Sequence, residues 1–72
     1  MRIIDNTLFT KREKEIVLLL LEGKTKQQIA EHLCLSVATI KAGTEKIYAK
    51  FNVHSKIELA LYLIQNKIVE LS

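Results

Sequence analysis

Apolar residues recur along the chain at the i, i+3 and i+4 intervals of an amphipathic helix. The clearest case is the stretch from Ser36 to Phe51, where Ile40, Thr44, Ile47 and Phe51 share one face. The pattern predicts an all-α fold of four helices, at residues about 10–22, 26–33, 37–51 and 56–66.

Local signals for helix ends agree with this periodicity. Ser36 is placed to cap the helix over 37–51, while Gly23 and Asn52 are typical stops at the ends of two helices. The other three helices each begin at a capping box, in which a hydroxyl and an acid or amide three residues later satisfy each other's backbone amides. These boxes are "TKRE" from Thr10, "TKQQ" from Thr25 and "SKIE" from Ser55.

The second and third helices have the proportions of a helix-turn-helix, a short helix and a longer one joined by about three residues. Ala30 fits the close crossing of the two helices, Cys34 fits the turn, and Ile40 fits the position that fixes the second helix to the first. Cysteine adopts positive φ less readily than glycine, so we expect a turn that needs no left-handed residue at Cys34.

The outer face of the helix over 37–51 carries chemistry suited to duplex DNA, because an α-helix fits the major groove. Lys41 can donate to guanine, Glu45 can accept from cytosine, and Ala42 is small enough to meet a thymine methyl group. These three residues are the predicted base contacts. Predicted backbone contacts are the lysines further along this helix and the hydroxyl residues at its start, namely Ser36, Thr39, Lys46 and Lys50.

Gly43 stands inside this helix, where glycine costs about 1 kcal/mol relative to alanine. Two interpretations remain open. Either this flank lies so close to a phosphate or sugar that no side chain is wanted, or a small residue is tolerated at a surface edge.

The helix over 56–66 is apolar on more than one side, which predicts burial on more than one side. Leu59, Ala60 and Leu63 can face the core. The chain ends, such as Ile3, Ile4 and Leu71, offer an alternative cover for the second stripe, but a two-fold homodimer is favoured. The predicted dimer interface is Ile57, Leu61, Ile64 and Ile68.

Composition narrows the class of protein. The chain has 72 residues, which predicts one domain over 1–72. The net charge of +3 and a pI of about 9.2 favour an anionic partner.

The single cysteine excludes an internal disulfide and suggests a cytoplasmic protein. No signal peptide or membrane span is expected. The start "MRIIDN" favours a free-standing chain over a fragment of a larger regulator, and both remain open.

Enzymatic, metal-dependent and ligand-binding functions are not predicted. The isolated His32 and His54 form no catalytic or metal-ligating set with other residues, and Cys34 is expected to be a small buried apolar residue. We expect no catalytic residue, cofactor, metal or small-molecule ligand in this chain.

Five short segments of the chain form a recognisable set. They are "T-x-R-E-x-E-[IV]" at 10–16, "G-K-[ST]" at 23–25, "I-A-x-x-L" at 29–33, "[IL]-S-x-x-T-[VI]-K" at 35–41 and "I-x-x-K-[LF]-x-V" at 47–53. Taken together, these motifs resemble the LuxR-type (GerE-like) helix-turn-helix DNA-binding domain.

The resemblance implies dimeric binding to paired half-sites and DNA contacts at the positions named above. It also implies contacts of Thr25 and Lys26 with the DNA backbone. The chain departs from the family at Gly43, where histidine is general, and at Glu45, where basic or neutral residues are common.

The sequence therefore predicts a bacterial transcription regulator, or its output domain, that binds duplex DNA as a homodimer. Gly43 and Glu45 motivate an alternative, a helix-turn-helix interaction module that pairs with and inhibits a related regulator.

Overall fold

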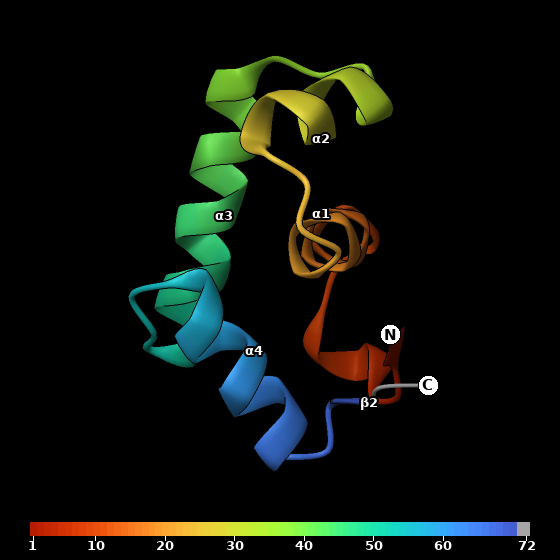
Figure 1. The fold of residues 1–72 in the computed structure, drawn as a ribbon, viewed down its shortest axis with the longest axis vertical. Helices are drawn as coiled ribbons and strands as arrows, with labels where there is room; N and C mark the ends of the chain where they lie inside the picture. Colours follow the sequence, from red (N-terminus) through yellow and green to blue (C-terminus); the bar gives the residue numbers. More distant parts are fainter. Residues whose placement is uncertain (71–72) are drawn as a thin grey trace.

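A computed structural model describes residues 1–70 of the chain. It confirms the expected four-helix arrangement, with helix ends within one residue of the predicted ones. In Figure 1, α3 runs along one side, α1 is seen nearly end-on, and α2 and α4 lie above and below it. The elements are β1 (Arg2–Ile3), the 3-10 helix η1 (Asn6–Leu8), α1 (Lys11–Leu21), α2 (Lys26–Leu33), α3 (Val37–Phe51), α4 (Lys56–Gln65) and β2 (Val69–Glu70).

Helix caps form largely as the sequence predicts. In the Thr10 box, the hydroxyl accepts from the amide of Glu13 at 3.1 Å and the Glu13 carboxylate accepts from the Thr10 amide at 2.9 Å. Thr25 and Gln28 make the same pair of bonds at the start of α2. The expected third box is incomplete. Ser55 accepts from the Glu58 amide, but the Glu58 carboxylate accepts from the amide of His54 instead of Ser55.

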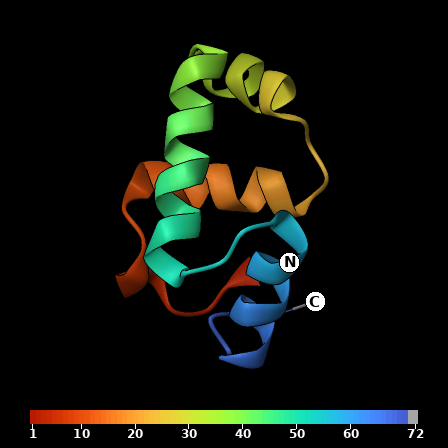
Figure 2. The same ribbon diagram turned by 90° about the vertical axis from the view of Figure 1, so that its left-hand side faces the viewer.

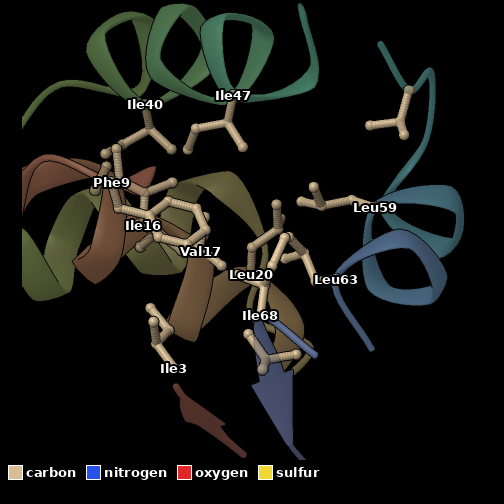
Figure 3. Close-up of a cluster of buried hydrophobic side chains, with 14 residues drawn as sticks. Ile3, Phe9, Ile16, Val17, Leu20, Ile40, Ile47, Leu59, Leu63 and Ile68 are labelled. Atoms are coloured by element: carbon tan, nitrogen blue, oxygen red, sulfur yellow. The ribbon is translucent and has the colours of Figure 1, made fainter. Parts of the chain in front are cut away.

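A single apolar cluster holds α1, α3 and α4 together. Figure 3 shows Ile40 and Ile47 of α3 directed at the α1 side chains Ile16 and Val17, with Leu59 of α4 reaching in from the side. These side chains are at most 1% exposed. Each buried aliphatic side chain contributes about 1.5–3 kcal/mol relative to an exposed one, so this cluster fixes where α3 lies.

The chain ends pair with each other, which the sequence patterns did not predict. β1 and β2 are antiparallel, with Arg2 opposite Glu70 and Ile3 opposite Val69, and Figure 1 shows both ends on the same side of the molecule. The amide of Ile4 donates to the carbonyl of Ile68 at 2.7 Å.

This pairing corrects the expectation for Ile68. The residue lies beyond the end of α4, is only 6% exposed and belongs to the core, so it is not part of an outward stripe with Ile57 and Leu61. Of the two paired ends, β2 contacts α4, while β1 contacts α1. Ile3, considered as cover for α4, is buried, and Ile4 is 47% exposed. Leu71, also considered as cover, lies outside the described residues.

The turn between α2 and α3 differs from the prediction. Cys34 ends α2 in the left-handed conformation, with φ 59° and ψ 43°, and its side chain is exposed, not buried. The amide of Leu35 donates to the carbonyl of Ala30 at 2.9 Å, which requires this reversal of the chain. The tight turn therefore imposes a backbone conformation that glycine would adopt at lower cost.

We expect Cys34→Gly to raise the free energy of unfolding by about 1 kcal/mol, because a non-glycine residue is strained in the left-handed region. Chemical denaturation measures the change. Asn52→Gly is the matched control, since Asn52 ends α3 with φ 54° and asparagine tolerates that region better. An equal or larger gain at Asn52 would contradict strain as the cause.

Candidate nucleic-acid interface

The outer face of α3 is open along its whole length. Lys41, Ala42, Glu45 and Lys46 are all exposed, while Ile40, Thr44 and Ile47 are buried on the opposite face. The Thr44 hydroxyl donates to the carbonyl of Ile40 at 2.8 Å, so this buried polar group is satisfied within the helix. Figure 2 shows α3 in front of α1, with no other helix covering it from that side.

Three exposed alanines leave much of this face without long side chains. Ala38, Ala42 and Ala49 are exposed and, with Glu45, follow the spacing i, i+4, i+7, i+11. The sequence reasoning assigned a DNA role only to Ala42, although the same spacing marks the other two. A row of methyl groups with one carboxylate at its centre allows the helix backbone to approach a flat or grooved partner closely.

The helix starts beside this face combine capping with free donors. The Ser36 hydroxyl accepts from the amide of Thr39 at 3.1 Å and lies 2.8 Å from the Thr39 hydroxyl, so one hydroxyl hydrogen of the pair remains free to donate. At the start of α2, Thr25 also uses its hydroxyl as an acceptor, and the adjacent Lys26 is exposed. Both helix starts can therefore donate to an anion while staying capped.

Lys50 has a different environment from the other lysines of α3. Its ammonium group donates to the Glu13 carboxylate at 2.5 Å and to the carbonyl of Leu8 at 2.9 Å, and it lies 5.9 Å from the centre of the Phe9 ring. The sequence patterns gave no sign of this pair, because Glu13 and Lys50 are 37 residues apart. Only one of the three N–H groups of Lys50 is left for another partner.

Glu13 is the buried member of the pair, with 5% of the residue exposed. Burial raises the pKa of its carboxyl. The hydrogen bonds from Lys50 and Thr10, together with the charges of Lys50 and Lys46, lower this pKa by more than burial raises it. The pKa of Glu13 therefore lies below its usual value. One oxygen, Oε2, is buried without a partner among the described residues. The carboxylate therefore depends on the neighbouring lysines for its charge.

Gly43 turns out to face the interior, which corrects both interpretations of it. A Cβ atom added to Gly43 would lie 2.9 Å from Cδ1 of Ile16, closer than packed atoms normally approach. Gly43 is half-buried against α1, and not on a flank beside DNA or at a tolerant edge. Its role is to let α3 pack close to α1.

We expect Gly43→Ala to lower the free energy of unfolding by about 1 kcal/mol, because the cost of overpacking exceeds the gain in helix propensity. In an Ile16→Val background, which removes Cδ1, the same change should raise it by about 1 kcal/mol. The four proteins are compared by urea denaturation. Ile29→Val, at a core isoleucine of α2, is the control background. There, Gly43→Ala should still lower the free energy of unfolding.

α4 presents a separate apolar surface. Ile57 is 71% exposed and Leu61 is 52% exposed, while Ile64 is half-buried. Tyr62, also exposed, contacts the ring of Phe51 with a centroid distance of 5.4 Å. Before the start of α4, an open hollow of about 430 Å³ lies over the end of α3 and the turn that follows, and it is lined by Glu45, Tyr48, Ala49, Asn52, Val53 and His54.

Within residues 1–70, no three His, Cys, Asp or Glu side chains gather as metal ligands would. Across the same range, no helix combines the length and apolarity needed to cross a membrane.

Comparison with known proteins agrees with this geometry. Residues 7–63 match the family described as "Bacterial regulatory proteins, luxR family". The chain is 38% identical over 60 residues to the transcriptional regulatory protein LiaR of Bacillus subtilis, an alignment of 83% of this chain and 28% of LiaR. It is 40% identical over 63 residues to the oxygen regulatory protein NreC of Staphylococcus epidermidis, covering 88% of this chain and 29% of NreC. The chain thus spans less than a third of the length of these relatives.

Proposed function

The chain belongs to the luxR family of bacterial regulatory proteins, and we propose that it is a DNA-binding output domain that places α3 in the major groove of duplex DNA. The observation that carries the proposal is the outer face of α3, where a low row of alanines lies between exposed lysines. Such a helix can enter the groove deeply without steric conflict. We place this regulator in the cytoplasm and assign it no enzymatic role.

Sequence readout is assigned to the middle of α3. Lys41 donates to the O6 or N7 atoms of guanine, Glu45 accepts from the N4 amino group of cytosine, and Ala42 contacts a thymine methyl group. Because Glu45 also repels phosphates, it favours sites that place a cytosine opposite it over non-specific DNA.

The phosphate contacts surround this readout. Lys46 and Lys26 contribute exposed ammonium groups, while Thr25, Ser36 and Thr39 contribute hydroxyl donors at the two helix starts. Lys50 contributes its one remaining N–H while it keeps its bond to Glu13. These contacts set the position of the protein on DNA and carry little sequence information.

Selection of bound duplexes from a random pool at about 0.1 M salt tests the proposal, since charge screening is already substantial there. We expect enrichment of paired half-sites about one helical turn apart, as for other dimeric helix-turn-helix proteins. Absence of both enrichment and salt-dependent retention would overturn it.

Two single changes separate base readout from phosphate contact on the selected duplex. Lys41→Ala should cost about 1–3 kcal/mol on the preferred sequence and remove discrimination at one base pair. Lys46→Ala should weaken all sequences alike and reduce the salt slope by about one. Fluorescence anisotropy titrations at several salt concentrations measure both. Equal losses on every sequence for Lys41→Ala would remove this lysine from base readout.

We also propose that the protein binds as a homodimer through α4. Ile57 and Leu61 support this assignment because two large aliphatic side chains lie exposed one turn apart, beside the half-buried Ile64. Symmetric pairing of such stripes is the common way to cover them. Ile68 is excluded from the interface because the core already buries it.

The alternative, an inhibitory interaction module, now rests on Glu45 alone, since Gly43 packs against α1. It predicts a tight complex with a related regulator and no retention of DNA even at low salt. The selection experiment separates the two functions directly.

A further inference from the structure

A second recognition surface lies on the outer side of α1 and α2. Two open hollows of about 270 and 220 Å³ share Leu19 and His32 and so form one continuous α1–α2 groove. On α1, the lining residues Glu15, Leu18, Leu19 and Glu22 follow the spacing i, i+3, i+4, i+7 of a single helix face. The opposite wall comes from α2 and the turn before it, through Lys24, Gln28, Glu31, His32 and Leu33.

The floor of the groove is apolar. Leu18, Leu19 and Leu33 pack against the core on one side and remain half-exposed on the other. Filling a hollow that has half-exposed leucines at its base with another apolar side chain is favourable, because water is displaced from both apolar surfaces.

The rim is acidic although the chain as a whole is basic. Glu15, Glu22 and Glu31 are exposed around the groove, and Lys24 is the only lysine among the lining residues. Within residues 1–70, the ion pairs are Arg2–Glu70 and Lys50–Glu13, so these three carboxylates have no cationic partner there. The net charge of +3 is thus distributed unevenly, and the groove is suited to a basic partner.

The groove and the DNA-facing helix occupy different sides of α1. None of the residues that line the two hollows comes from α3. The side of α1 that meets α3 is the one that carries Ile16, next to Gly43. A partner in the groove would therefore leave α3 free.

We propose that the α1–α2 groove docks a basic amphipathic helix of a partner protein. An apolar side chain of that helix fills the hollow between Leu19 and His32, and its lysine or arginine residues face Glu15, Glu22 and Glu31. This is the helix-in-groove mode of recognition, with apolar anchors one helical turn apart and charges that fix the orientation. The inference goes beyond DNA binding and does not depend on it.

The probe is a synthetic helical peptide with leucines at i, i+3, i+4 and i+7 and lysines elsewhere, added to the protein without DNA. Amide NMR shifts should change along Leu18–Glu22 and Glu31–Leu33. The same peptide with glutamates in place of the lysines should cause no change. Shifts confined to α3, equal binding of both peptides, or no shifts at millimolar peptide would each overturn the proposal.

The double variant Glu15→Gln and Glu31→Gln should bind the lysine peptide about five- to tenfold more weakly, as expected for the loss of two exposed ion pairs. Glu45→Gln removes an exposed carboxylate from α3 and is the matched control, with unchanged peptide affinity expected. Undiminished binding by the double variant would contradict the assignment. Retention of the selected duplex by the same double variant, measured separately, keeps this test distinct from that of DNA binding.

Discussion

Replacing Lys50 with methionine should lower the free energy of unfolding by about 2–3 kcal/mol, because the buried Glu13 carboxylate loses its cationic partner. The value lies below the roughly 3–5 kcal/mol typical of a fully buried pair, since a third of the Lys50 side chain is exposed. Methionine keeps most of the aliphatic length of lysine, so the change removes mainly charge and hydrogen bonds. Urea denaturation at neutral pH measures the loss.

Two comparisons identify the cause of that loss. Lys41→Met removes an exposed lysine of α3 that makes no ion pair within residues 1–70 and is not among the charges that act on Glu13, and it should change stability by no more than about 0.5 kcal/mol. The double variant Glu13→Gln and Lys50→Met should be more stable than Lys50→Met alone, because no buried charge is then left unpaired. A Lys50→Met protein as stable as the parent would show that Glu13 does not need this partner.

Acid should reduce the difference between the parent and Lys50→Met. In the parent, the Glu13 pKa is lowered on folding, so its stabilising effect is present above the usual carboxyl range and is lost as the pH falls through the folded-state pKa. In Lys50→Met, burial acts without the opposing lysine, so Glu13 takes up a proton at higher pH and the unpaired charge disappears. Denaturation curves from pH 7 down to about pH 3 should therefore converge.

Local patterns in the sequence were enough for the helices and for the outer face of α3. Periodicity located each helix, and the boxes at Thr10 and Thr25 form as expected because both partners lie within one turn. The exposure of Lys41, Ala42 and Glu45 follows from the same periodicity, since burying Ile40 and Ile47 turns the opposite face outward. Near neighbours in the chain decide all of these features.

The features that were missed depend on residues far away in the chain. Gly43 could be interpreted only once Ile16 was seen against it, and Lys50 only once Glu13 was seen beneath it. Cys34 was missed for a related reason: the tight turn between two packed helices imposes a left-handed backbone conformation that cysteine itself disfavours. Such tertiary contacts give no signal in local periodicity.

The same distinction applies to α4, whose two apolar stripes looked equivalent in the sequence. Contacts with the chain ends bury Ile68 and leave Ile57 and Leu61 as the exposed part. The proposed dimer therefore rests on a short surface, so each of its side chains must contribute a large share of the association free energy.

Leu61→Asp should consequently weaken the homodimer at least about 100-fold, because two symmetry-related leucines are lost at roughly 1.5 kcal/mol each and two carboxylates face each other. The monomer should remain folded, because Leu61 is 52% exposed and makes little contact with the core. Sedimentation equilibrium measures the association, and circular dichroism measures the fold. On DNA, the variant should lose its preference for paired half-sites over a single half-site.

Gln65→Asp is the matched control, since it adds the same charge to α4 at an exposed polar position. It should leave both the association and the preference for paired half-sites unchanged. Leu63→Asp, at a fully buried position of the same helix, should unfold the protein and so mark the signature of core damage. If Leu61→Asp behaves like Leu63→Asp, the leucine belongs to the core. If it behaves like Gln65→Asp, the dimer forms through another surface, because an interface centred on Ile57 and Leu61 cannot accommodate two opposed carboxylates.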